Sequence, residues 1–318
     1  MKKALLAAVL CLFAVSATTY AIDYPTKNIN INVPYAAGGT TDLSTRALTD
    51  SIPAGVMPSG VSFVITNMPG GSGLVGTTNF STARKDGYRI GIVNCDFLLN
   101  IVRGATQLKL EQFVPLAFIQ ADPYLVLVRD DAPYKTYQDL VNHMKANPDE
   151  IKCADSGPGS VPHLAAVAMM KAHGISMKTM GYDNSLEATM SVVNGETDFV
   201  ISHSSAASGQ LKAGAVRPLA CTSNERLSLF PDVPAIGELY PAEAGDMKVL
   251  SWIAVAALTG TPQGCIDWLR DTFNKSAKTD VYKDKLKNFQ MQDVSHFTAD
   301  DMQAFFAEQA EYYKKQLQ

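Results

Sequence analysis

Short β-type runs alternate with helical stretches along most of the chain. In the first series, strands are predicted at Ile29–Val33, Ser62–Thr66 and Tyr88–Val93, with helices at Thr41–Thr49 and Val75–Arg84 between them. Glycine-rich loops and the Asp86-Gly87 turn separate these runs. Alternating strands and helices are typical of parallel sheets covered by helices. The pattern therefore predicts an α/β fold.

A second series of the same kind begins near Pro123. Helix caps are predicted at Thr136, with Asp139 three residues on, and at Asn184, with Glu187 three residues on, while Gly174 marks a helix end. The predicted strands are Tyr124–Val128, Ile151–Ala154, Ser176–Met180, Thr197–Ile201 and Val216–Ala220, and the predicted helices follow Thr136 and span His163–His173, Leu186–Val193 and a short stretch to Ala213.

The last part of the chain resembles the first series. It has a predicted buried strand at Leu250–Ala257, a helix that begins at Pro262 and a terminal helix that begins at Thr298. No Pro/Gly/Ser-rich linker separates the two halves. We therefore expect two lobes joined by short crossings that act as a hinge. The predicted lobes are residues 22–122 plus 223–318 and residues 123–222, with crossings near Ala121-Asp122 and Thr222-Ser223.

The first 21 residues read as a signal peptide rather than as part of the fold. Lys2 and Lys3 precede an apolar stretch from Ala4 to Val15, and cleavage is predicted after Ala21. The alternative is a membrane anchor, but a bilayer span needs about 20 apolar residues, and this stretch is shorter. We therefore expect a soluble periplasmic protein with no direct membrane insertion.

Composition narrows the function classes. The chain has 27 basic and 31 acidic residues, and loss of Lys2 and Lys3 leaves a net charge near −6. An acidic chain without a basic run argues against nucleic-acid binding. The four cysteines beyond the signal peptide lie singly in apolar segments, without metal-ligand spacing, so buried, unpaired thiols are expected and neither a metal nor a cofactor is. These cysteines are Cys95, Cys153, Cys221 and Cys265.

Ligands bind open parallel sheets at the carboxyl ends of the strands. The loops predicted at that edge are small, hydroxylic and rich in glycine. They span residues 35–41, 68–73 and 94–96 in lobe one, and 155–160, 182–185 and 202–205 in lobe two. The candidate ligand-binding residues on these loops are Tyr35, Ala37, Gly38, Gly39, Thr40, Thr41, Gly71, Ser72, Asn94, Ser156, Gly157, Gly159, Ser160, Tyr182 and Ser202.

Two of these loops suit an anion. Residues 36–41 and 156–160 each bring backbone N–H groups together ahead of a helix, where a carboxylate gains about 0.3–1 kcal/mol from the helix dipole. One such site in each lobe would hold two ends of one carboxylate ligand or clamp a single group. The alternative is that these glycines and serines only cap helices and form turns. His163, in the first turn of a predicted helix, is a candidate ligand donor or a packing residue.

Two other motifs suggest enzymes. Gly71–Gly76 matches GxGxxG after a strand and has Asp96 twenty residues beyond, as in a dinucleotide site, although export separates the protein from cytoplasmic cofactors. Ser160, His163 and Asp198 are residue types of a catalytic triad. Ser160 and His163 share a helix start, however, and the chain has no GxSxG motif. An exported NAD-dependent oxidoreductase or hydrolase remains the alternative to a binding protein.

An ordered set of motifs resembles the Bug receptors, the substrate-binding proteins of tripartite tricarboxylate transporters. The set begins with Tyr24-Pro25 and the segment 34–39 followed by Asp42. It continues through the residues 67–73, Asp86-Gly87-Tyr88, 133–136, 156–165 and 231–234, and so covers the chain beyond the signal peptide. Each motif is weak alone, whereas the order of all of them is specific.

The resemblance implies a type II periplasmic-binding-protein fold with a ligand cleft between two lobes. It implies a carboxylate ligand, such as a dicarboxylate, tricarboxylate, amino acid or aromatic acid, delivered to a two-component permease driven by an ion gradient. It also implies ligand contacts from Ala37 to Asp42 and from Ser156 to His163, and a cleft-lining role for Gly71–Gly76. A receptor that signals to a sensor kinase is a further alternative.

The chain departs from this family at two places. Gly181-Tyr182-Asp183-Asn184 stands where a Pro-Tyr-Lys-Gly-like segment is common, and the family's acid near Ser202 is absent. Loss of a lysine and gain of Asp183 make the second lobe more acidic. We therefore expect a ligand that is less anionic than a typical one, or that carries an amine.

Overall fold

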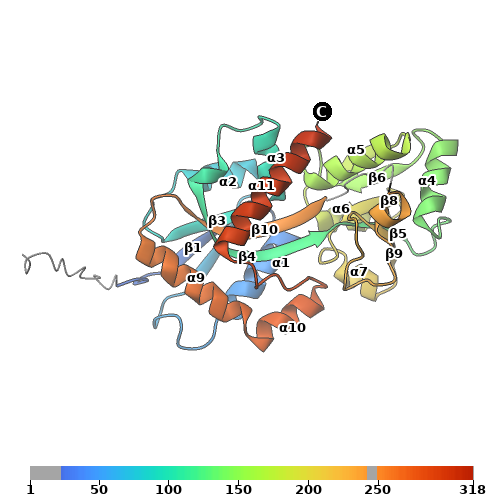
Figure 1. Ribbon diagram of the computed structural model, residues 1–318. Coiled ribbons are helices and arrows are strands. Elements are labelled where there is room, and N and C mark those ends of the chain that lie inside the picture. The colour runs from blue at the N-terminus through green and yellow to red at the C-terminus, as the bar shows by residue number, and fades with distance from the viewer. Residues whose placement is uncertain (1–22, 242–248, 318) are drawn as a thin grey trace, which may run out of the picture.

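A computed structural model of the protein describes residues 23–241 and 249–317, so the predicted signal peptide lies outside the described residues. The described chain forms two mixed five-stranded sheets that lie side by side (Figure 1). The first sheet contains β1 (Ile29–Val33), β2 (Phe63–Asn67), β3 (Arg89–Asn94), β4 (Phe113–Pro123) and β10 (Leu250–Leu258). The second contains β5 (Leu125–Arg129), β6 (Lys152–Asp155), β7 (Lys178–Gly181), β8 (Phe199–Ser202) and β9 (Val216–Cys221).

The first sheet has the strand order β2-β1-β3-β10-β4 and is covered by helices on both faces (Figure 1). Ile29, Ile31 and Val33 alternate along β1 with polar residues and pack against one set of helices. That set is α1 (Thr40–Thr49), α9 (Gln263–Ala277) and α10 (Asp280–Asn288), and the other face is covered by α2 (Leu74–Ser81), α3 (Cys95–Val102) and α11 (Ala299–Gln316).

The second sheet has the order β7-β6-β8-β5-β9. In β5 the two faces separate with a period of two: Val126 and Val128 belong to one apolar cluster and Leu125 and Leu127 to another. The first cluster packs under α4 (Tyr137–Ala146) and α5 (Val161–His173), and the second under α6 (Ser185–Val193) and the short α7 (Ser208–Lys212). The four-residue α8 (Ile236–Leu239) follows β9, and a 3₁₀ turn, η1 (Leu110–Gln112), precedes β4.

The predicted helix ends are confirmed where a side chain defines them. Thr136 and Asp139 form a reciprocal capping box, and Thr298 forms another with Asp301. Asn184 accepts a hydrogen bond from the N–H of Glu187. Gly174 ends α5 in the left-handed conformation. Local hydrogen bonds determine these positions, which is why a single sequence reveals them.

The pattern is typical of parallel sheets, but one strand in each sheet runs antiparallel to its neighbours. β10 runs antiparallel to β3 and β4, and β5 runs antiparallel to β8 and β9. β10 and β5 are each the first strand after the chain has crossed from the other sheet. They therefore run away from the place where the chain crosses, while the other described strands run toward it. Five described elements are also absent from the predicted set: β4, α3, α8, α10 and η1.

The joint between the sheets consists of two neighbouring chain segments. Pro123 at the end of β4 pairs with Leu250 at the start of β10. Beside this pair, Thr222 N–H donates to the Tyr124 carbonyl oxygen (2.9 Å), and Tyr124 N–H donates to Thr222 Oγ1 (3.0 Å). The Thr222 hydroxyl donates in turn to the carbonyl oxygen of Val249 (2.9 Å). These bonds hold both crossings together at one edge.

The segment after Thr222 packs with the second sheet rather than the first. Cys221 forms a bridge with Ala235, and Leu227 lies in the same apolar cluster as residues of β5 and β9. The Tyr240 ring lies 4.4 Å from that of His173 at the end of α5. The described part of residues 223–241 therefore contacts the second unit, although the sequence predicts that it belongs to lobe one.

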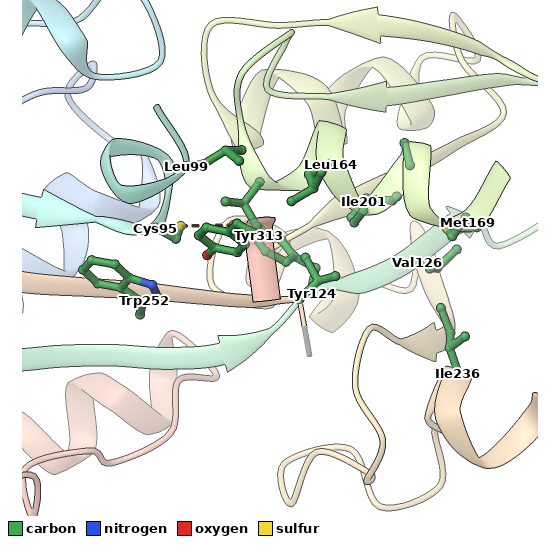
Figure 2. Close-up of a cluster of buried hydrophobic side chains, with 14 of the residues drawn as sticks. Cys95, Leu99, Tyr124, Val126, Leu164, Met169, Ile201, Ile236, Trp252 and Tyr313 are labelled. Atoms are coloured by element: carbon green, nitrogen blue, oxygen red, sulfur yellow. Dashed lines mark hydrogen bonds between the residues drawn. The ribbon is translucent and has the colours of Figure 1, made fainter. Parts of the chain in front are cut away.

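One apolar cluster continues through the joint (Figure 2). It includes Trp252 and Tyr313 of the first unit, Tyr124 at the crossing and Leu164 of the second unit. All four described cysteines are buried and free, which confirms the expectation of unpaired thiols. Within residues 23–241 and 249–317, no helix is both long and apolar enough to cross a membrane.

Gly76 allows α2 to pack against the loop that follows β1. A Cβ atom at this position would lie 2.6 Å from the Met68 carbonyl oxygen and 2.7 Å from Pro34 Cα, both backbone atoms. We expect Gly76→Ala to lower the free energy of unfolding by about 1–3 kcal/mol because the backbone must shift. Urea denaturation measures this change. Gly209→Ala is the matched control, since its Cβ would meet nothing within 4 Å, and an equal loss in both variants would contradict the packing argument.

Asp122 makes stability depend on pH. Burial at the end of β4 raises its pKa from 3.8 to about 7, although the N–H of Gln292 donates to Oδ1 and opposes the shift. The native state therefore keeps a proton that the unfolded chain releases above pH 4, so the free energy of unfolding falls as pH rises from about 4 to about 7. One pKa unit corresponds to about 1.4 kcal/mol, which gives an upper limit of about 4 kcal/mol. Asp122→Asn should flatten this slope in urea titrations at several pH values; an unchanged slope would refute the assignment.

Candidate functional site

The starts of several helices meet between the two sheets. α1 and α3 begin after β1 and β3 of the first sheet, and α5 and α6 begin after β6 and β7 of the second. A cavity of about 30 Å³ lies at this meeting point. It is lined by Tyr35, Gly39, Thr40, Thr41, Asn94, Cys95, Asp96, Tyr124, Ser156, Pro162, Asn184, Ser185, His203, Ser251 and Ile253. We call it the central cavity.

A second, larger cavity of about 290 Å³ adjoins the first through the shared residues Tyr35 and Ser156. Its walls are the glycine loop after β2 and the loop after β7. We call it the outer cavity, and it is lined by Tyr35, Pro69, Gly70, Gly71, Ser72, Gly73, Ser156, Tyr182 and Asp183.

Nine of the predicted ligand-binding residues line at least one of the two cavities: Tyr35, Gly39, Thr40, Thr41, Gly71, Ser72, Asn94, Ser156 and Tyr182. Eight others belong to the same loops or the helices that follow them but line neither cavity in the described structure: Ala37, Gly38, Asp42, Gly157, Gly159, Ser160, His163 and Ser202. The polar groups of several of this second set are already bonded within the protein.

Asp42 organises the loop after β1. Its carboxylate accepts hydrogen bonds from the Gly38 N–H (2.9 Å), Arg46 Nε (2.9 Å) and Asn67 Nδ2 (3.0 Å), and it is 2% exposed. Burial works to raise the pKa of Asp42, but the hydrogen bonds from Arg46, Gly38 and Asn67 together lower it. The bond from Gly38 holds the loop closed, so that Thr40 and Thr41 begin α1 at the cavity.

A buried network surrounds Asp96. Its Oδ2 accepts from the Tyr35 hydroxyl (2.6 Å), which accepts in turn from Asn94 Nδ2 (2.8 Å). Its Oδ1 accepts from the backbone N–H of Val161 (2.7 Å), the first residue of α5. Burial raises the pKa of Asp96, and the donors Tyr35 and Val161 counteract that shift. Asp96 of the first unit therefore forms a hydrogen bond with the start of α5 in the second unit.

The polar groups of the loop before α5 form hydrogen bonds within the protein. The Ser160 hydroxyl caps the helix by accepting from His163 N–H (3.3 Å), and His163 Nδ1 lies 2.9 Å from the carboxylate of Asp155. Gly159 has a φ of +93°, and a Cβ there would lie 2.5 Å from the Arg103 guanidinium, so a larger residue would be strained and would displace that side chain. The second predicted anion site is thus occupied by groups of this chain.

The start of α6 faces the central cavity with the Ser185 hydroxyl and the Asn184 amide, beside the Ser156 hydroxyl from the loop after β6. Asn184 caps the helix, and Ser185 Oγ lies 3.4 Å from Ser156 Oγ. Behind them, Ser202 bonds to Thr189 (2.9 Å), and it is fully buried. Ser202 therefore supports α6 and does not reach the cavity.

His203 and Ser251 form the inner wall of the central cavity. His203 packs against Tyr124 with the rings tilted and their centroids 4.7 Å apart, and burial lowers the pKa of His203 to about 3, so the imidazole is neutral. His203 Nδ1 and Ser251 Oγ are buried and have no hydrogen-bond partner among the described residues. Buried polar atoms without partners are rare in native proteins, so these two are candidates for ligand or water contact.

Several lining residues lie on predicted ligand-edge loops without being among the individual residues predicted. Asp96, Asn184, Ser185 and His203 are of this kind. Ser251 could also have been singled out from the sequence, because it is the one hydroxyl residue in the apolar segment that forms β10. Tyr124 gave no such signal, because its contact with the cavity depends on the crossing of the two units.

The cavity walls carry negative but not positive charge. Asp96 and Asp183 line them, and neither set of lining residues includes a lysine or arginine. In the described part of the chain, no three His, Cys, Asp or Glu side chains gather as a metal site would require. Further contacts join the units near the cavity: Ser205 Oγ donates to Thr40 Oγ1 (3.2 Å), and Ser204 Oγ to the Gln290 carbonyl oxygen (2.7 Å).

Comparison with known proteins gives a consistent result. The tripartite tricarboxylate transporter family receptor model matches residues 57–318. BugT of Bordetella pertussis is 26% identical over 270 residues, covering 83% of this chain and 81% of its own. A UPF0065 protein of Agrobacterium vitis, from the TAR-I ttuE-ttuC' intergenic region, is 26% identical over 258 residues, covering 80% of this chain and 72% of its own.

Solved structures agree with this result. The periplasmic binding protein BugD has a TM-score of 0.82 and 25% identity, and the alignment covers 92% of this chain and 97% of that one. The Rhodopseudomonas palustris protein Rpa4515, solved with adipate, has a TM-score of 0.82, 26% identity and the same coverage. The predicted periplasmic-binding-protein fold is thereby confirmed. The chain belongs to the tripartite tricarboxylate transporter receptor family and is a periplasmic solute-binding receptor.

Proposed function

We propose that this receptor captures a small carboxylate between its two lobes, closes over it and delivers it to a two-component membrane permease of the tripartite tricarboxylate type. The main observation in support is that the N-termini of α1 and α6 face one cavity between the two sheets. First-turn N–H groups and the helix dipole favour an anion there by about 0.3–1 kcal/mol for each helix. The relative solved with adipate is consistent with a carboxylate ligand.

Capture requires the lobes to part. The central cavity, at about 30 Å³, has room for little more than water, which needs about 10–15 Å³ on the same measure. A carboxylate with several carbon atoms therefore reaches α1 and α6 only when the contacts across the cleft are broken. These contacts include the bonds from Asp96 to Val161 and from Ser205 to Thr40.

The hinge lies at the joint. Tyr124 and the region of Val249 are the two points where the chain passes between the sheets, and Thr222 bonds to both. The segment from Ser223 to Pro241 moves with the second lobe in this proposal, because Leu227 and Ala235 pack there. Lobe two then spans residues 123–241, somewhat more than the pattern of strands and helices predicts.

The glycine stretch Gly71–Gly76 serves the cleft rather than a dinucleotide in this proposal. Gly71 and Gly73 have positive φ and line the outer cavity, while Gly76 packs against Pro34. The loop thus forms a turn at the cleft, and the receptor is not an enzyme. A permease is favoured over a sensor kinase as the partner because the family is defined by its transporter.

A thermal-shift screen of the protein without its signal peptide tests this function. We expect at least one mono-, di- or tricarboxylate to raise the midpoint, since a ligand that binds only the folded state stabilises it by mass action. NAD, included as a control, should have no effect. A shift with NAD alone would overturn the receptor proposal in favour of an oxidoreductase.

Ser156→Ala should weaken binding of the carboxylate found in this screen by about tenfold, as expected for loss of one hydrogen bond to a charged group. Ser156 lines both cavities. Ser59→Ala, in an exposed loop, is the matched control and should bind like the wild type. Calorimetric titration compares the three proteins. Equal affinities would remove Ser156 from the site.

Closure has its own test. Small-angle scattering should give a smaller radius of gyration with a saturating carboxylate than without it, because the lobes rotate together about the joint. A radius that stays constant while calorimetry reports binding would exclude a closure of this kind.

A further inference from the structure

The start of α5 has no backbone donor left for a solute. Val161 N–H donates to Asp96, Pro162 has no N–H, and His163 N–H donates to the Ser160 hydroxyl. Leu164 N–H donates to the Ser160 carbonyl oxygen within the helix. A helix N-terminus is a ready site for an anion, and here a carboxylate of the other lobe fills it.

Asp96 is built into this position. It stands in the first turn of α3, whose cap is Asn94, and is 6% exposed. Tyr35 donates to one carboxylate oxygen at 2.6 Å and Val161 to the other at 2.7 Å. Both partners act as donors, so the carboxylate is bound as an acceptor on both oxygens, as a solute carboxylate would be.

The rest of the central cavity offers one site for a carboxylate. That site is formed by the first turns of α1, with Thr40 and Thr41, and of α6, with Ser185. The inner wall presents the uncharged groups His203 Nδ1 and Ser251 Oγ, neither of which has a partner among the described residues. A second solute carboxylate would meet Asp96 instead of a cation.

We propose that Asp96 occupies the position that a second solute carboxylate would otherwise take. The receptor therefore prefers solutes with a single carboxylate and no second negative charge to dicarboxylates. This inference rests on the proposed function, since it presumes that a carboxylate binds at α1 and α6. Asp96 acts through like-charge repulsion, which is strong in a site with little water. Solutes whose far end is a hydroxyl or a protonated amine avoid that repulsion and find polar partners in the inner wall.

Length-matched probes test the selection. Succinate is compared with 4-hydroxybutanoate and 4-aminobutanoate, and adipate with 6-hydroxyhexanoate and 6-aminohexanoate, by calorimetric titration at constant pH and ionic strength. We expect at least one monocarboxylate to bind the wild-type protein about tenfold or more tightly than the dicarboxylate of the same length, as one repelled charge in a buried site implies. This measurement requires no variant.

Asp96→Asn removes the charge while an amide keeps the shape and the capacity to accept from Val161. The preference for the monocarboxylate should then shrink by about tenfold, mostly through tighter dicarboxylate binding. Asp183→Asn is the matched control: Asp183 lines the outer cavity but is exposed, so water screens its charge and the preference should change less.

The outcomes separate the two proposals. A wild-type protein that binds a dicarboxylate as tightly as its length-matched monocarboxylates, or a preference that is the same in folded Asp96→Asn, overturns the role of Asp96 and leaves the receptor function standing. Failure of every carboxylate to bind both proteins overturns the proposed function, and the inference with it.

Discussion

The pairing of β4 with β10 is the constraint on which the rest of the structure depends. The chain leaves the first sheet at Pro123 and returns to it at Leu250, and these residues are register partners in one antiparallel ladder. Both crossings are therefore held at one edge, where Thr222 bonds to each of them. With the joint at a single edge, the two units face each other, which is the geometry that the proposed lobe rotation requires.

The same constraint explains why the polar groups meet in the cleft. Parallel strands direct their carboxyl ends, and so the helix starts that follow, toward the joint, while β5 and β10 lead the chain away from it. α1, α3, α5 and α6 then begin at one place and bring their unpaired N–H groups together. Asp96, in the first turn of α3, accepts from the start of α5, so the starts of α1 and α6 are the ones that the proposed function assigns to a solute.

Much of this architecture could be predicted from the sequence. The period-two pattern of β1 and the caps at Thr136, Asn184 and Thr298 depend on neighbours a few residues away, and they are found where the pattern indicates. The family resemblance rests on an ordered set of such local motifs and agrees with the family match. The loops at the ligand edge could also be identified, because a strand followed by a helix is visible in one chain.

The sequence by itself thus determined the fold class, the helix ends and the loops that reach the cleft, because local hydrogen bonds and hydrophobic periodicity encode them. Only the tertiary structure decided which residues of those loops face the cavity. Asp96 and Val161, which bond to each other, are 65 positions apart in the sequence. The Gly38 N–H donates to Asp42, whereas the sequence is equally compatible with that N–H binding a ligand. The antiparallel strands and the attachment of residues 223–241 to the second unit depend in the same way on contacts across the joint, which no local pattern records.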